Sequence, residues 1–289
     1  MRVVVIGARG QLGAAVVQAF ASGNEVIPLA RRDLDVVDDA AVAAAMERVG
    51  PSAIVNCAAY NDVDAAEDHP AEALHVNAFA VRALAAAAAK LDATLVHYSS
   101  DFVFDGAATV PYTEDDRPNP RSVYAASKLL GEWFAADAPR HYVLRVESLF
   151  GHAEGGAAAK GTVAGFLNKL AARETIRVFA DRVVSPTYVP DAAKATRLLV
   201  ERLARPGVYH CVNSGSCTWP EFATELAARL HIEPRLMPVR MADAALRAAR
   251  PLYCALSNQK LRATGIEMPT WQDAVGQFAA LIRSQSPAR

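Results

Sequence analysis

The stretch VVVIGARGQLGAAVV (residues 3–17) joins an apolar run, three glycines and an alanine-rich segment. The run is typical of a buried strand and the last segment of a helix, so Gly7, Gly10 and Gly13 fall in the turn between them. Glycine permits a tight turn and lets backbone N–H groups approach a pyrophosphate at the helix N-terminus. The spacing is G-x-x-G-x-x-G rather than G-x-G-x-x-G, but it lies where phosphate binding requires it. The stretch therefore predicts a dinucleotide-binding turn.

The same alternation of strand and helix continues to residue 145. Runs rich in β-branched residues lie at 2–6, 25–29, 53–57, 94–99 and 141–146. Apolar residues occupy both faces of these runs, as expected of strands buried between two layers of helices. Segments long enough for crossover helices lie between them, at 11–22, 38–50, 70–92 and 122–137. The pattern predicts an α/β fold with a Rossmann-type, doubly wound parallel sheet.

Beyond residue 150 the alternation becomes less regular. Strands are predicted at 176–180 and 207–212, and helices near 162–173, 190–203, 218–230 and from Trp271. We interpret residues 1–150 as a dinucleotide-binding domain, to which later elements near 184–212 return. Residues 151–183 and 213–289 are predicted to form a smaller C-terminal substrate-binding portion.

Composition narrows the class of partner. The formal net charge is −1 and 52% of the residues are hydrophobic. This balance does not favour nucleic acid or an anionic membrane surface as a partner. We expect no membrane span, because no apolar run reaches about 18 residues. The start MRVVVIG contains no basic leader or cleavage site, so a cytoplasmic location is predicted.

The cysteines and histidines form no metal-ligand pattern. Four cysteines and seven histidines are present, without CxxC or HExxH spacing. Reduced, buried thiols are the expected state of such cysteines in a cytoplasmic protein. We predict no catalytic metal and leave a structural ion open.

The end of the second predicted strand bears on the choice of nicotinamide cofactor. An acid at this point usually bonds the ribose 2′-OH of NAD, but here Arg31 and Arg32 follow Ala30. An arginine can pair with a 2′-phosphate, which favours NADPH. Asp33 and Asp35 leave NADH open, and the two arginines could also be a solvated surface pair.

Three polar residues suggest proton chemistry. The fourth predicted strand ends at Ser99 and Ser100, and Tyr124 precedes Lys128 by one helical turn, so both share a helix face. A tyrosine pKa near 10 is too high for acid–base work at neutral pH, and a nearby cation lowers it. With a serine to hold a carbonyl oxygen, the set predicts a general-acid site for hydride reduction of a ketone.

With these motifs, the sequence resembles the extended short-chain dehydrogenase/reductase superfamily, and within it the dTDP-4-dehydrorhamnose reductase family. The resemblance spans about residues 2–283, including IVNCAAYNDVDAAEDHP, HYSSDFVFDG and PNPRSVYAASKLLGE. It implies that Ser100, Tyr124 and Lys128 are catalytic. By the same resemblance, the cofactor would contact Gly7, Gly10, Gln11, Leu12, Gly13, Asp35, Val36, Ala58, Ala59 and Tyr60, in addition to Tyr124 and Lys128. The sugar nucleotide would contact Asn61, Val63, Asp101 and Phe102.

Phe102 separates this chain from related dehydratases. The sugar-nucleotide dehydratases of the superfamily carry an Asp-Glu pair after the catalytic Ser or Thr, whereas this chain has Asp101 followed by Phe102. The resemblance therefore implies carbonyl reduction rather than dehydration.

Two substrate-side segments depart from the family pattern. Ser148 stands where a sugar-stacking tryptophan is expected, and Tyr253 and Cys254 replace the usual Asn-Ser after Arg250-Pro251. We take Ser148, Arg250 and Tyr253 as further candidate substrate residues. Either the nucleotide or the sugar differs from dTDP-4-dehydrorhamnose, or the changes are ordinary drift.

The resulting hypothesis is an NADPH-preferring reductase of a 4-keto sugar nucleotide, with Tyr124 as the proton donor. The alternatives are a non-catalytic NADP-binding regulatory subunit, like the methionine adenosyltransferase β subunit, and a reductase of a different ketone or aldehyde. A homodimer is left open.

Overall fold

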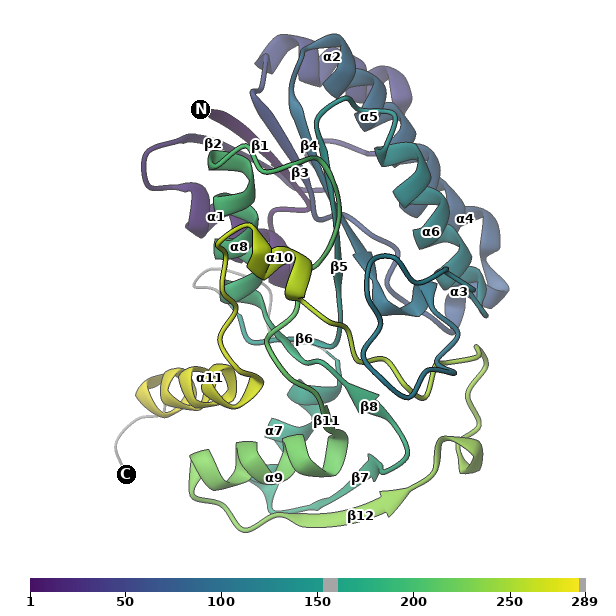
Figure 1. Ribbon diagram of the computed structural model, residues 1–289, viewed down its shortest axis with the longest axis vertical. Coiled ribbons are helices and arrows are strands. Elements are labelled where there is room, and N and C mark those ends of the chain that lie inside the picture. The colour runs from purple at the N-terminus through teal and green to yellow at the C-terminus, as the bar shows by residue number, and fades with distance from the viewer. Residues whose placement is uncertain (153–160, 286–289) are drawn as a thin grey trace.

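The computed structural model describes residues 1–152 and 161–285. Its centre is a six-stranded sheet in which every pair of neighbouring strands is parallel. The strands, from one edge to the other, are β2 (Glu25–Leu29), β1 (Arg2–Ile6), β3 (Ala53–Asn56), β4 (Thr94–Ser100), β5 (His141–Val146) and β10 (Gly207–His210). Helices cover both faces of this sheet (Figure 1), which confirms the predicted Rossmann-type α/β fold.

Alternating side chains of β1 show why both faces need cover. Val3 and Val5 belong to one apolar core cluster, and Val4 and Ile6 to another, because successive strand residues point to opposite faces. The first cluster is completed by α1 (Gln11–Phe20) and α8 (Val189–Glu201). The second is completed by α2 (Asp39–Val49), α5 (Ala80–Lys90) and α6 (Val123–Ala135). Each strand is thus buried on two sides, as its continuous apolar pattern requires.

The order of the strands places a crevice beside β1. The chain passes from β1 outward to β2 and then crosses back to β3, β4 and β5 on the other side. The carboxyl ends of β1 and β3 are therefore neighbours at the point where the winding reverses, which is where parallel α/β sheets bind ligands. The glycine turn follows β1, and residues 57–60 follow β3.

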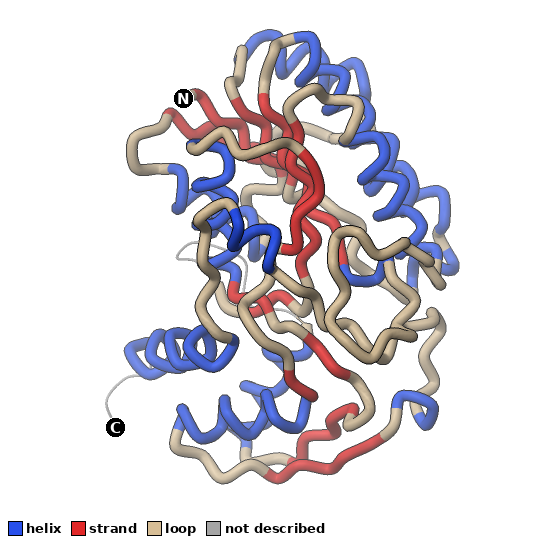
Figure 2. Tube along the Cα trace, viewed as in Figure 1, coloured by secondary structure: helices blue, strands red, loops and turns tan. Residues whose placement is uncertain are grey.

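A second group of elements lies below the sheet in Figures 1 and 2. It contains α7 (Thr162–Ala172), α9 (Trp219–Leu230), α11 (Trp271–Gln285), and the parallel pair β7 (Thr175–Phe179) and β12 (Arg235–Val239). Short strand pairs join β6 (Leu149–Phe150) to β9 (Thr187–Tyr188), and β8 (Val183–Val184) to β11 (Cys217–Thr218). An aromatic-rich core fills this part, with Phe150, Phe222 and Phe278 fully buried.

Some elements differ from the predicted pattern. The helical segment predicted over 70–92 consists of α4 (Pro70–Leu74), a π-helical turn η1 (His75–Phe79) and α5. A short helix, α10 (Gln259–Ala263), packs near β10 and contributes Leu261 to the core on the α1 side of the sheet. Within the described residues, no helix is both long and apolar enough to cross a membrane.

The backbone of the glycine turn leaves no room for a side chain at Gly13. Gly7 has φ +73°, and a Cβ at Gly13 would lie 2.2 Å from the Gly7 carbonyl oxygen. We expect Gly13→Ala to lower the free energy of unfolding by about 1–3 kcal/mol, since the start of α1 must shift, and to weaken cofactor binding. Urea unfolding and cofactor titration measure the two effects.

Gly165→Ala is the matched control. Gly165 lies in the interior of α7 with no atom within 4 Å of a built Cβ. That substitution should stabilise the protein by about 0.5–1 kcal/mol, because alanine favours a helix over glycine. Equal effects of the two substitutions would contradict the steric argument for Gly13.

Candidate active site

A cavity of about 910 Å³ opens where β1, β3, β4 and β5 end. Several segments predicted from sequence converge on it: the glycine turn, the residues after β3 and β4, and the first turns of α6. Residues of the lower part close its other side, among them Thr162 and Val163 of α7 and Trp219 of α9. The cavity is therefore shared between the sheet and the lower group of elements.

Ser100 is the last residue of β4, and its hydroxyl group makes two hydrogen bonds. Its Oγ donates to Asp101 Oδ1 at 2.8 Å and accepts from the backbone N–H of Phe102 at 3.2 Å. The second bond caps a single 3₁₀ turn, η2 (Asp101–Val103). Ser100 lines the cavity, but its hydroxyl proton faces Asp101 in this arrangement.

Tyr124 and Lys128 both line the cavity from α6. Ser122 caps this helix by accepting from the Ala125 N–H at 3.2 Å. Tyr124 is 8% exposed and its ring packs edge-on against Phe102, with centroids 5.5 Å apart. Lys128 Nζ donates to the Tyr98 carbonyl oxygen at 2.6 Å. The Ser100–Tyr124–Lys128 set predicted from sequence is thus brought to one cavity.

Burial dominates the acid–base properties of these groups. It raises the pKa of Tyr124, and the negative charge of Asp101 raises it further. Burial also lowers the pKa of Lys128 to about 8, although Glu132 opposes this shift. The lowering of the Tyr124 pKa by Lys128 that the sequence suggested is not seen in this arrangement, in which the ammonium group bonds a carbonyl oxygen instead.

The π-helical turn positions the loop after β3. It contains the buried Asn77, which accepts from the Tyr60 N–H at 2.8 Å and donates to the Tyr60 carbonyl oxygen at 3.1 Å. The same amide donates to Ser127 Oγ of α6 at 2.9 Å. One buried amide therefore fixes the β3 loop relative to the helix that carries Tyr124 and Lys128.

The predicted cofactor residues divide into two sets. Gly10, Gln11, Leu12, Gly13 and Ala59 line the cavity together with Tyr124 and Lys128. The others do not line it: Gly7, Arg31, Arg32, Asp35, Val36, Ala58 and Tyr60.

Arg31 and Arg32 follow β2 on the protein surface, outside the cavity. Both are exposed, and Arg32 forms a 3.6 Å ion pair with Asp33. The Asp33 carboxylate itself accepts from the Ala30 N–H at 2.9 Å, and Asp35 accepts from the Val37 N–H at 3.3 Å. Asp33 and Asp35 thus accept hydrogen bonds from backbone N–H groups of their own turn. The guanidinium groups of Arg31 and Arg32 face solvent.

The predicted substrate residues also divide. Those that line the cavity are Asn61, Val63, Asp101, Phe102, Ser148 and Arg250. Arg250 makes a two-pronged pair with Asp64, 2.8 Å for each contact. Tyr253 is not a lining residue, because it packs beside Tyr112 with ring centroids 6.4 Å apart. The structure separates Tyr253 from the other candidates.

Several lining residues were not predicted from the sequence. They are Cys57, Asp62, Tyr98, Ser99, Val146, Leu149, Gly161, Thr162, Val163, Arg182 and Trp219. Cys57, Ser99 and Leu149 are next to predicted positions and could have been inferred from them. Arg182 and Trp219 had no local signal, because only the packing of the lower elements brings them to the cavity.

A buried ionic cluster adjoins Ser100. Oxygens of Asp101 and Glu147 and the Cys254 sulfur lie within 4.8 Å of one another, and all three residues are buried. Arg182 approaches the same group, with Nη2 3.7 Å from Asp101 Oδ2 and both Nε and Nη2 3.4 Å from Cys254 Sγ. Its guanidinium also lies 5.4 Å from the Phe102 ring centroid. A cation of the protein itself thus occupies the cluster.

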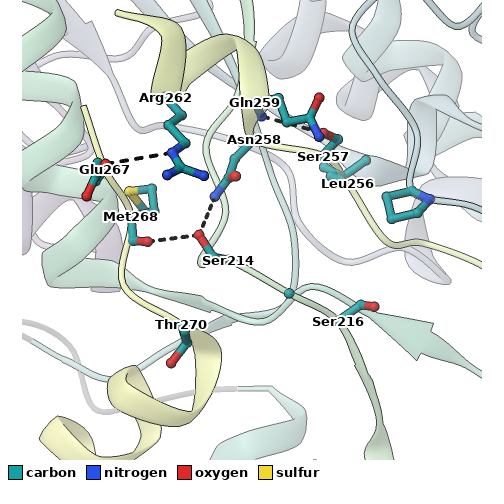
Figure 3. Close-up of a pocket in the computed structure, with 12 residues that line it drawn as sticks. Ser214, Ser216, Leu256, Ser257, Asn258, Gln259, Arg262, Glu267, Met268 and Thr270 are labelled. Carbon is teal, nitrogen blue, oxygen red and sulfur yellow. Dashed lines mark hydrogen bonds and ion pairs between the residues drawn. The ribbon is translucent and has the colours of Figure 1, made fainter. Parts of the chain in front are cut away.

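A second cavity, of about 450 Å³, is lined by a different set of residues (Figure 3). Asn258 donates to Ser214 Oγ at 3.1 Å, and Ser214 Oγ donates to the Met268 carbonyl oxygen at 2.8 Å. These polar groups satisfy one another, and Arg262 faces Glu267 at 3.7 Å. We assign this cavity no function.

Comparison with known proteins gives consistent matches over the whole chain. Residues 1–284 match the family model described as the RmlD substrate binding domain. A dTDP-4-dehydrorhamnose reductase from Burkholderia thailandensis is 35% identical, and the match covers 99% of this chain and all of that protein.

Solved structures agree with these sequence matches. A dTDP-4-dehydrorhamnose reductase from Clostridium acetobutylicum has a TM-score of 0.92 at 31% identity, covering 98% of this chain and 100% of that one. A dTDP-4-dehydrorhamnose reductase from Bacillus anthracis, in complex with NADP, has a TM-score of 0.91 at 31% identity, covering 97% and 99%. The similarity therefore includes both the sheet and the lower group of elements.

Proposed function

This chain belongs to the RmlD substrate binding domain family, and from that premise we propose that it reduces the 4-keto group of a nucleotide-linked sugar with NADPH. It is an NAD(P)H-dependent oxidoreductase of the short-chain dehydrogenase/reductase type. The proposed substrate is dTDP-4-dehydrorhamnose or a close relative of it. We further propose that residues 1–150, with elements near 184–212, hold the cofactor and that the remaining portions hold the substrate.

One observation carries the proposal. Ser100, Tyr124 and Lys128 line the same cavity as the glycine turn, although they come from separate segments of the chain. A proton donor and a pyrophosphate site that share one cavity suit hydride reduction better than binding alone. The regulatory-subunit alternative requires neither the serine nor the tyrosine.

The residues at the cavity fit a dinucleotide. Gly10 caps α1 without any side-chain hydrogen bond, and no acidic residue lies in the first turn. The helix N-terminus therefore keeps its N–H groups and its positive end free for a pyrophosphate. When bound there, the nicotinamide supplies a hydride. Lys128 would hold the nicotinamide ribose, and Arg31 and Arg32 would pair with a 2′-phosphate.

Side chains of the protein would supply the proton and position the substrate oxygen. Tyr124 would donate its phenolic proton to the C4 oxygen as that oxygen gains negative charge, and its raised pKa keeps the proton on the phenol until then. Ser100 would hold the same oxygen by a hydrogen bond. Phe102 packs against Tyr124 and supplies no second acid, which fits reduction without loss of water.

A matrix of substrates and cofactors tests the proposal. Purified protein would be assayed with NADPH and NADH against 4-keto sugars linked to dTDP, UDP and GDP. We expect turnover of the dTDP sugar, with NADPH preferred over NADH. Replacing Arg31 and Arg32 together by alanine should reduce that preference about tenfold or more, since each charge-assisted bond contributes about 1.5–3 kcal/mol. Cofactor binding with no turnover of any sugar would support the regulatory alternative.

The Lys128 pKa gives a prediction about pH. With a pKa of about 8, Lys128 is charged below that pH and neutral above it. We expect kcat/KM to fall as pH rises through about 8, because the neutral amine loses its attraction for the ribose hydroxyls and the developing phenolate. A pH–rate profile measures this, with exposed Lys90→Met as a control that keeps the same profile. A flat profile well above pH 8 would contradict the assigned role.

A further inference from the structure

The carboxyl pair beside Ser100 carries more charge than its one cation balances. Asp101 is 3% exposed and Glu147 1% exposed, and among the described residues Arg182 is the cation that pairs with Asp101 and lowers the pKa of Glu147 by its charge. Asp101 Oδ2 is buried and has no hydrogen-bond partner. Glu147 accepts from the Ser185 N–H and, at 3.4 Å, from Ser148 Oγ. Two ionised carboxylates so close together would leave a net negative charge in a buried place.

Burial favours a proton on such a pair. Burial raises the pKa of both carboxyl groups, and the Asp101 charge raises that of Glu147 further. The other titratable groups that face the pair are Tyr124, Cys254 and Cys217, and burial keeps each of them neutral by raising its pKa. Arg182 stays charged, because it is always protonated in proteins. The described surroundings thus offer one positive charge to two acids.

The location of that proton decides where the Ser100 hydroxyl points. While Asp101 is ionised, Ser100 Oγ donates to its Oδ1 across their 2.8 Å contact and cannot donate to a substrate oxygen. A protonated Asp101 would instead donate to Ser100 Oγ and free the serine proton for the carbonyl. Negative charge developing on the nearby Tyr124 favours a proton on Asp101, because the two groups repel when both are charged.

We propose that Glu147 is a positioning residue that keeps one proton on the Glu147–Asp101 pair, and that this proton turns the Ser100 hydroxyl from Asp101 toward the carbonyl oxygen of the substrate. This inference rests on the proposed reductase function. The proton stays within the pair and is not consumed: Tyr124 supplies the proton that the product keeps. A divalent ion does not suit this place, because the Arg182 guanidinium lies against Asp101 and Cys254.

Glu147→Gln tests the proposal through the pH profile. The neutral amide leaves Asp101 alone with Arg182, so Asp101 stays ionised at neutral pH and holds the serine proton. We expect kcat to fall about tenfold, less than the 10²–10³ of a lost oxyanion donor. The high-pH limb of kcat, which reports on the enzyme–substrate complex and is distinct from the kcat/KM limb assigned to Lys128, should also move at least one unit lower, since acid restores a proton to Asp101. Glu201→Gln, outside the cavity, should leave the limb in place.

A double substitution separates positioning from structural damage. In Asp101→Asn, the amide donates to Ser100 at every pH. The high-pH limb of kcat then no longer reflects the titration of residue 101. Adding Glu147→Gln to this variant should therefore lower kcat no further. If Glu147→Gln reduces kcat equally in both backgrounds, or leaves the limb unmoved, the proposal is wrong.

An infrared difference spectrum between the wild type and Glu147→Gln tests, without turnover, whether the carboxyl pair holds a proton. At neutral pH the wild type should show a protonated carboxyl band that Glu147→Gln lacks. Absence of that band overturns this inference. Failure of the wild type to reduce any 4-keto sugar would instead overturn the proposed function, whatever the infrared result.

Discussion

Tyr124→Phe is expected to lower kcat about 10²- to 10⁴-fold while leaving the fold and cofactor affinity nearly unchanged. The phenolic hydroxyl is the acid in the proposed reaction, and phenylalanine lacks it. The ring itself is buried against Phe102 at 5.5 Å, and phenylalanine preserves that edge-on contact. Single-turnover reduction, urea unfolding and cofactor titration would measure the three quantities separately.

Tyr142→Phe is the control for this prediction. Tyr142 is buried in β5 and its hydroxyl donates to the Ala204 carbonyl oxygen at 2.7 Å, away from the cavity. Its loss should lower the free energy of unfolding by about 1 kcal/mol and leave kcat unchanged. An undiminished kcat in Tyr124→Phe would refute its role as the acid. If Tyr124→Phe lowered both kcat and the free energy of unfolding, the loss of activity would be attributed to a disturbed structure and not to the missing acid.

The sequence predicted the parts of the site that depend on local pattern. Buried strands and amphipathic helices alternate from residue 1 to 145, and parallel strands place their carboxyl ends at one edge. Gly7 to Gly13 and Ser100 therefore had to lie near one another once the sheet was recognised. Tyr124 and Lys128 followed from helical spacing, because i and i+4 share a face.

What the sequence could not predict depends on contacts between distant segments. Glu147, Arg182 and Cys254 come from three separate stretches, and no period or spacing links them to Asp101. Tyr253 follows a passage without helical or strand periodicity, and contacts with distant segments determine its place: a β-bridge to Val183 and ring packing against Tyr112. The π-helical turn at residues 75–79 looks like ordinary helix in an alanine-rich segment, because only its hydrogen-bond pattern differs.

The buried pair Glu132–Arg145 adjoins the catalytic set through Ser99 and α6. Arg145 Nε and Nη2 donate to the two carboxylate oxygens at 2.8 and 2.7 Å, and both side chains are 4% exposed. Ser99, the neighbour of Ser100, also donates to Glu132 at 2.5 Å. The pair thus ties α6, which carries Tyr124 and Lys128, to β4 and β5.

We expect Arg145→Met to lower the free energy of unfolding by about 3–5 kcal/mol, because it leaves a buried carboxylate without its cation. Glu132→Leu combined with Arg145→Met should recover most of that loss, since an apolar pair leaves no unbalanced charge. The exposed pair Glu225–Arg229, joined at 2.7 Å, is the control, and Arg229→Met there should change stability by only about 0.5 kcal/mol. Urea unfolding of the four proteins measures these differences. If Arg145→Met were no worse than Arg229→Met, burial would not govern the strength of the pair, and the rigid support proposed for Ser100 and Tyr124 would have to come from elsewhere.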